Sequence, residues 1–304
     1  MTVPTPDWLD LLPEVAAALR EAKPVVALES SLITHGLPRP VNLDVARALE
    51  AEIRSRGAVP ATVAVLAGRI RVGLTLEDLS QLAEDKTARK ASRRDLSGTH
   101  VYGGTAGTTV AATAHVAHAA GIKTFATGGI GGVHRGPSGD ISADLPALAE
   151  IPMVVVCSGA KSILDLPRTM EWLETHSIPV LGWGTNELPA FFSQSSGLPL
   201  ESRVENAEQA VRWARAHWRL GLHSAVIVCV PCPEAHALPV EKVETWLREA
   251  EALANDVQGP GKTPYVLDRL SQVSGGATLA ANRALLLKNA SVAAALAGAL
   301  GRTV

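Results

Sequence analysis

The chain has 304 residues, 47% of them hydrophobic and 19% charged, and its formal net charge at pH 7 is −2. This is the composition of a soluble globular protein, and it lacks the overall positive charge that is typical of proteins that bind nucleic acid or an anionic membrane. Three cysteines cannot form a disulfide framework, so we expect a cytoplasmic protein. The apolar tail 277–301 is interrupted by two cations and two asparagines, which predicts no membrane span.

Short β-branched segments alternate with amphipathic segments through most of the chain. The segments predicted as strands are 24–30, 61–73, 123–129, 152–157, 179–184 and 224–230, with 61–73 folded into a hairpin at Ala67 and Gly68. The segments predicted as helices are 42–57, 108–121, 163–177 and 206–221, the first with Asn42 as its N-cap and Gly57 just after its end.

This alternation predicts a mostly parallel sheet covered by helices, with some antiparallel strands. We expect a single α/β domain over 1–304. It would comprise an N-terminal helix within 1–23, a sheet core over 24–257 and a helical C-terminal part over 258–304.

Chemically capable residues follow the predicted strands, where the crevice of a parallel sheet opens. They are Glu29, His134, Arg135, Asp140, Asp144 and Lys161. Lys161 follows the apolar run 151–157 after three small residues, near the end of a buried strand, so its ammonium loses part of its hydration. It can serve there as an ion-pair partner, a phosphate ligand or a reactive amine, or it can simply reach solvent at the start of the next helix.

Five glycines within 128–136 form a loop that lets backbone N–H groups approach an anion. Its spacing fits neither a P-loop nor a dinucleotide fingerprint, so we expect a phosphate site, with a mobile surface turn as the alternative. Asp140 and Asp144, four residues apart, suggest a hard divalent cation. Ser142 is predicted to cap a helix that has Asp144 in its first turn.

Three further features need an interpretation. Lys90 lies in a basic run over 89–96 that can bind an anion. The C-x-x-C pair at 229–232 has no second pair for zinc, which favours a structural role. Asn282 and Asn289 share a helix face and need partners if buried; they either hold loops or reach a ligand.

With these motifs assembled, the sequence resembles the pseudouridine-5′-phosphate glycosidase family over nearly its whole length. The motifs that carry the resemblance are ALES-x-x-x-x-HG-x-P-x-P (27–40), GAVPATVAVLAGRIRVGL (57–74), KASRRDL (90–96), FATGGIGGVHRG (125–136), DISADL (140–145) and CSGAKSILDLP (157–167). The resemblance implies a homotrimer with a three-layer α/β/α fold, and an enzyme that cleaves or forms the C–C bond between uracil and C1′ of ribose 5-phosphate.

The resemblance also implies roles for individual residues. Lys161 would form an imine with the ring-opened sugar, Glu29 would act as the general acid and base, and Asp144 would assist proton transfer. Asp140 would hold one Mn²⁺. The substrate contacts implied in this way are Lys90, Val110, Ser142, Ala143 and Asp144. We also expect His134 and Arg135, as further donors of the glycine-rich loop, to contact the substrate, together with Thr109 and Asn289.

The sequence departs from the family pattern at 97–107 and 186–188, on the side where the base is expected. Two other functions therefore stay open. One is a C-glycosynthase of the alnumycin type, which joins ribose 5-phosphate to an aromatic polyketide. The other is a phosphosugar-binding protein without turnover, although the presence of Glu29, Asp144 and Lys161 together favours an enzyme.

Overall fold

The computed structural model describes residues 6–136, 139–253 and 262–301. The first residues of the predicted N-terminal part and the predicted boundary at 257/258 lie outside these ranges. The strands of the main sheet are β1 (Leu9–Leu11), β2 (Val25–Glu29), β3 (Val59–Leu66), β4 (Arg69–Val72), β5 (Arg89–Ala91), β6 (Ala106–Thr108), β7 (Thr124–Ala126), β9 (Val154–Cys157), β11 (Val180–Trp183), β12 (Ser202–Val204) and β13 (Val226–Cys229). A separate antiparallel pair consists of β8 (Val133–His134) and β10 (Leu164–Asp165).

The α-helices are α1 (Pro13–Arg20), α2 (Val41–Ser55), α3 (Leu76–Glu84), α4 (Leu96–Val101), α5 (Val110–Ala119), α6 (Asp144–Glu150), α7 (Leu166–Thr175), α8 (Ala207–Arg219), α9 (Val240–Ala252), α10 (Lys262–Val273) and α11 (Ala277–Gly301). Three short helical turns are η1 (Leu32–Gly36), η2 (Arg93–Asp95) and η3 (Glu234–His236).

The main sheet is mostly parallel, which confirms the prediction. Its strand order is β1-β4-β3-β2-β7-β9-β13-β11-β12, and β5 and β6 attach beside β3. All six predicted strand regions are present, and β4 runs antiparallel to β3. The turn between them falls at Ala67 and Gly68, both of which have positive φ, as a two-residue hairpin turn requires.

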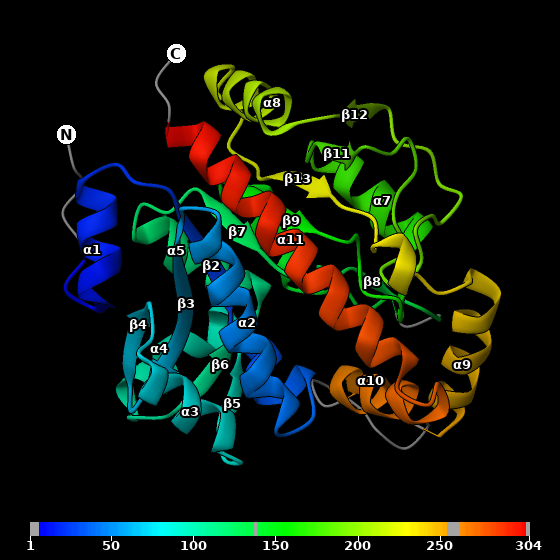
Figure 1. The fold of residues 1–304 in the computed structure, drawn as a ribbon, viewed down its shortest axis with the longest axis horizontal. Coiled ribbons are helices and arrows are strands. Elements are labelled where there is room, and N and C mark those ends of the chain that lie inside the picture. The colour runs from blue at the N-terminus through cyan, green and yellow to red at the C-terminus, as the bar shows by residue number, and fades with distance from the viewer. Residues whose placement is uncertain (1–5, 137–138, 254–261, 302–304) are drawn as a thin grey trace.

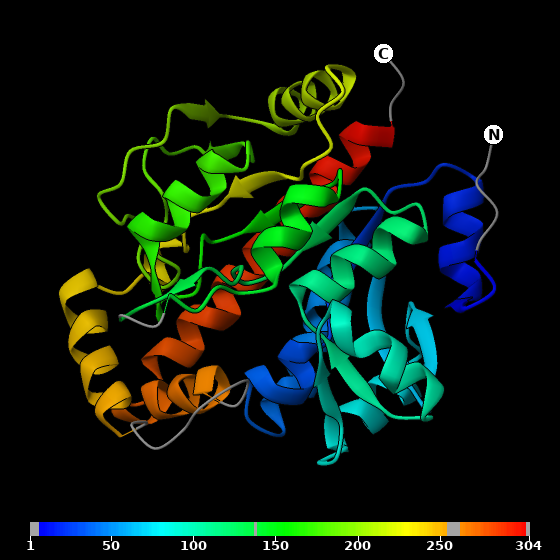
Figure 2. The ribbon, with the colours of Figure 1, turned by 180° about the vertical axis from the view of Figure 1, so that it is seen from behind.

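Helices cover both faces of the sheet, giving the expected three layers. On one face α11 crosses diagonally, with α2 and α8 beside it (Figure 1). On the opposite face lie α5, α6 and α7 (Figure 2). By length and composition α11 could cross a bilayer, but 56% of its most apolar window is buried inside the protein. It is a core helix, packed on β7 and β9.

The predicted N-cap residues of two helices, α2 and α6, were wrong. Asn42 is not the N-cap of α2, which is Pro40; Asn42 lies inside the helix, buried, and its amide donates to the carbonyls of Ile33 and Ala83. The cap position of α6 is Ala143, although the Ser142 hydroxyl accepts from the N–H of Asp144 at 3.2 Å. Asn42 is the second residue of α2, and buried carbonyls supply the partners that its amide needs there.

Candidate active site

A cavity opens at the carboxyl ends of the central strands. Three charged side chains from separate parts of the chain line it: Glu29 at the end of β2, Lys90 on β5 and Lys161 after β9. The rest of its lining is Ser31, Leu32, His35, Gly36, Gly128, Gly129, Phe191 and Asn282. The topology therefore brings Glu29 and Lys161 together as predicted for the rim of a parallel sheet.

The Glu29 carboxylate is held in one orientation. It is buried, its Oε2 accepts from the Ser31 hydroxyl at 2.5 Å, and its Oε1 accepts from the Thr127 hydroxyl. Thr127 follows β7, so neighbouring strands supply the carboxylate and one of its donors. A fixed carboxylate at the wall of a cavity can act as a general acid or base.

Lys90 reaches this cavity because two short strands extend the sheet. Strand β2 ends opposite Val63, and beyond that point β6 pairs with Ala64 and Val65 of β3. Strand β5 pairs in turn with β6. Burial lowers the pKa of Lys90, the charge of Lys161 lowers it further, and Glu29 and Asp144 act in the opposite direction.

Asp144 anchors two segments around the cavity. It is buried; its Oδ1 accepts from the N–H of Ala111 at 2.9 Å and its Oδ2 from the N–H of Gly131 at 2.8 Å. A Cβ at position 131 would stand 2.6 Å from that same Oδ2, so only glycine permits the approach. The carboxylate thus fastens the start of α5 to the glycine-rich loop.

The other residues around these anchors occupy helix starts. Thr109 is the N-cap of α5, with its hydroxyl accepting from the N–H of Ala112, and Val110 follows it, buried. Ser142 and Ala143 lie just before α6. On the Lys161 segment, the N–H of Lys161 itself donates to the carbonyl of Ile130 at 3.0 Å.

Of the nine expected substrate contacts, all within the described ranges, only Lys90 lines the cavity. Two of the others, Arg135 and Asn289, are committed to partners elsewhere. Arg135 is ion-paired with Glu244 and lines a different pocket, together with Leu164. Asn289 is fully buried; its amide donates to the carbonyl of Thr127 at 2.9 Å and exchanges hydrogen bonds with Ser158. Of the asparagine pair, Asn289 holds the loops and Asn282 lines the cavity.

Asp140 and His134 stand at the surface beside the loop. The Asp140 side chain is 70% exposed, its nearest cationic candidate is His134 Nε2 at 4.0 Å, and its carbonyl accepts from the N–H of His134. Within the described ranges no cluster of three or more His, Cys, Asp or Glu side chains could hold a metal. A single exposed carboxylate suits a hard cation that keeps most of its water.

The glycine-rich loop is partly committed to internal bonds. The N–H groups of Ile130, Gly131, Val133 and His134 donate to Gly159, Asp144, Thr169 and Asp140. The glycine-rich loop therefore cannot bind a phosphate with all of its N–H groups, as a cradle made of the whole loop would. The remaining edge, Gly128 and Gly129, lines the cavity.

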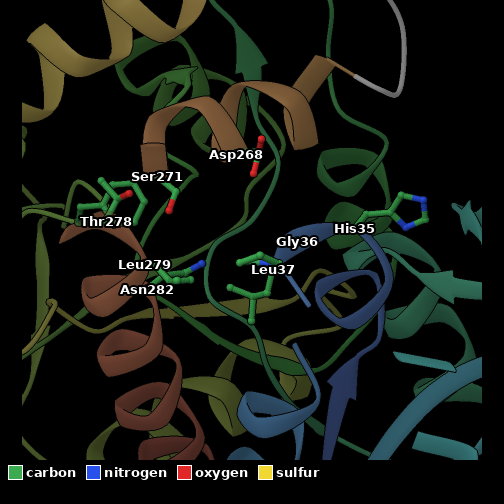
Figure 3. Close-up of a pocket in the computed structure, with 10 residues that line it drawn as sticks. His35, Gly36, Leu37, Asp268, Ser271, Thr278, Leu279 and Asn282 are labelled. Atoms are coloured by element: carbon green, nitrogen blue, oxygen red, sulfur yellow. The ribbon is translucent and has the colours of Figure 1, made fainter. Parts of the chain in front are cut away.

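Five residues of the cavity lining had no function predicted from the sequence: Ser31, Leu32, His35, Gly36 and Phe191. The only signal for His35 was its place in the 27–40 motif. His35, Gly36 and Asn282 also line an adjoining pocket, formed with Asp268 and Ser271 of α10 and with Thr278 and Leu279 of α11 (Figure 3). Burial lowers the pKa of His35, with Lys90 and Arg39 acting in the same direction.

The segments that depart from the family pattern lie elsewhere. None of residues 97–107 or 186–188, all within the described part of the chain, lines the cavity or the adjoining pocket. Tyr102 is 87% exposed at the end of α4. The inference that these departures mark the acceptor side is therefore not supported by their position.

Comparison with known proteins gives a consistent set of relatives. The profile of the indigoidine synthase A like proteins matches residues 14–299. The chain is 55% identical to a pseudouridine-5′-phosphate glycosidase of Rhodospirillum centenum (97% of this chain, 93% of that one) and 49% identical to one of Sorangium cellulosum (97% and 94%).

Two solved structures are similar to it throughout. One is the prealnumycin C-glycosynthase AlnA in complex with ribulose 5-phosphate, with a TM-score of 0.89 and 40% identity over 97% of this chain and 98% of that one. The other is an indigoidine synthase A like protein from Thermotoga maritima, with a TM-score of 0.90 and 35% identity over 97% of each chain.

Proposed function

The chain belongs to the family of indigoidine synthase A like proteins, and from that premise we propose that it is a pseudouridine-5′-phosphate glycosidase. It would cleave, or reversibly form, the C–C bond between uracil and C1′ of ribose 5-phosphate. The observation that carries the proposal is the cavity in which Glu29, Lys90 and Lys161 meet. Relatives with 45–55% identity that bear this name support it.

Lysine chemistry answers the central difficulty of this reaction. A carbon glycoside has no heteroatom leaving group to protonate, so the usual two-carboxylate mechanism fails. In our proposal Glu29 donates a proton to the ring oxygen as the sugar ring opens, and the Lys161 amine bonds to C1′. Glu29 takes up the proton that the Lys161 nitrogen loses on bonding. The C1′–C5 bond then breaks, its electron pair stays with C5, and C5 receives this proton as uracil leaves. C1′ remains as the imine of Lys161, and water hydrolyses this imine to ribose 5-phosphate and the free lysine.

The remaining residues bind and orient. The Lys90 ammonium, partly desolvated beside Glu29, offers a charge for the sugar phosphate. Asp144 fixes the α5 start and the Gly131 backbone around the substrate. We further propose that Asp140 holds one Mn²⁺ in its hydrated form, which when bound would supply positive charge beside the sugar-phosphate site.

The direct test supplies pseudouridine 5′-phosphate and Mn²⁺ and follows uracil by chromatography. We expect kcat/KM in the usual enzyme range, about 10⁴ M⁻¹s⁻¹ or above, and no release by Lys161→Ala. A protein that labels with ribose 5-phosphate under borohydride but releases no uracil would instead be a C-glycosynthase, which the similarity to AlnA keeps as the second candidate. Binding of the sugar phosphate without labelling would indicate a protein that only binds it.

We also propose that the chain works as a homotrimer in the cytoplasm. The family resemblance supports this, and exposed apolar side chains such as Val101 and Tyr102, 72% and 87% exposed, offer surface for contacts between copies. Light scattering on the purified protein would give the mass of the assembly, and a monomer at micromolar concentration would contradict the proposal.

A further inference from the structure

Arg135 is held by four hydrogen bonds, none of them to the cavity. Its Nη1 and Nη2 donate to the two carboxylate oxygens of Glu244 on α9 at 2.9 and 2.8 Å. Its Nη2 also donates to the carbonyl of Ser162 at 3.1 Å, and its Nε donates to the carbonyl of Leu164 at 3.2 Å. A bidentate fork of this kind fixes geometry as well as charge.

The two carbonyls belong to the segment that carries Lys161. Ser162 follows Lys161 directly, and Leu164 pairs with His134 where β10 meets β8. The N–H of Leu164 donates to the carbonyl of Lys161, and the N–H of Lys161 donates to Ile130. Arg135 therefore bridges Glu244 to the backbone on the C-terminal side of the nucleophile.

The ion pair contributes more to the position of the backbone next to Lys161 than to the free energy of unfolding. The side chains of Arg135 and Glu244 are 33% and 43% exposed, and a pair this exposed adds little to the free energy of unfolding. However, the same guanidinium clamps two backbone carbonyls within three residues of Lys161. A shift of about 1 Å in a reacting group can lower a rate by about 100-fold.

We propose that Glu244, acting through Arg135, is a positioning residue that fixes the backbone over 159–164 and thereby the Lys161 amine. The proposal rests on the imine chemistry proposed above. It replaces direct contact between Arg135 and the substrate with an indirect role, because the guanidinium is already committed and faces a different pocket.

The test compares Glu244→Gln with Glu249→Gln, an exposed glutamate on the same helix, and with the conservative Glu244→Asp. Amide hydrogen exchange over 159–165 is measured in the full-length protein, alongside kcat and KM for pseudouridine 5′-phosphate. We expect Glu244→Gln to speed exchange in this segment at least threefold while leaving β13 unchanged. We also expect kcat to fall about tenfold at a KM within twofold of wild type, with partial recovery in Glu244→Asp and no effect of Glu249→Gln.

Opposite results would overturn the proposal. If Arg135 were a substrate ligand, Arg135→Lys would raise KM at unchanged kcat, and Glu244→Gln would lower KM by releasing the guanidinium. Unchanged exchange over 159–165 in Glu244→Gln would also refute it. If wild type fails to turn over the substrate, the proposed function fails, whereas the exchange measurement still decides whether Glu244 fixes the segment.

Discussion

Replacing Asp144 by asparagine tests the anchor that joins α5 to the glycine-rich loop. Both carboxylate oxygens accept a backbone N–H, from Ala111 and from Gly131. Asparagine keeps one acceptor oxygen and presents an NH₂ to the other N–H, which is then left without a partner. An unsatisfied buried donor costs about 1–3 kcal/mol. We expect Asp144→Asn to lower the free energy of unfolding by that amount.

The assay is urea unfolding followed by tryptophan fluorescence, with the slope checked for constancy across variants. Asp144→Ala leaves both N–H groups without a partner, so its loss should be about twice as large. Asp140→Asn, four residues earlier and exposed, should stay within about 0.5 kcal/mol of wild type. The loss of unfolding free energy should be largest for Asp144→Ala, smaller for Asp144→Asn and smallest for Asp140→Asn. This order would show that Asp144 anchors the two segments. If Asp144→Asn unfolds within 0.5 kcal/mol of wild type, the reasoning is refuted.

Three further predictions concern the residues of the proposed reaction. Borohydride with ribose 5-phosphate should label the tryptic peptide that contains Lys161, and labelling on another lysine would remove it as the nucleophile. Asp140→Ala should lose activity that excess Mn²⁺ partly restores, and full wild-type turnover in a strong chelator would contradict the metal role. Burial lowers the pKa of Lys90 in the folded protein. At a pH between the folded-state and unfolded-state pKa values, Lys90 is therefore protonated in the unfolded chain and neutral in the folded one. The free energy of unfolding should therefore rise with pH across that window relative to Lys90→Met, and a parallel pH profile for the two proteins would count against a partly buried Lys90 ammonium.

The positions of the longer strands along the chain could be predicted from the sequence alone. Apolar runs such as 152–157 are continuous because a parallel strand is buried on both faces, and their carboxyl ends must meet at one rim. This is why Glu29 and Lys161, at the ends of two such strands, could be placed together without coordinates. The turn at Ala67 and Gly68 was equally local, since it depends on two adjacent residues with positive φ, one of which is a glycine.

Short strands gave no such signal. Strands β5 and β6 have three residues each, too few to establish a period of two, and they form because β3 offers an edge beyond the end of β2. The position of Lys90 depends on this pairing. The sequence marked Lys90 as an anion-binding candidate within a basic run, and the family resemblance marked it as a substrate contact, but neither placed it in one cavity with Glu29 and Lys161.

The partners of polar side chains were decided by tertiary structure. Arg135 looked like an anion ligand because it follows a glycine-rich loop, but its carboxylate partner Glu244 lies 109 residues away. Asn289 likewise finds Thr127 across 162 residues. Hydrophobic periodicity is set by the local geometry of helix and strand, so it survives in the sequence. A hydrogen bond between distant residues is fixed only by the packing that brings the two groups within about 3 Å.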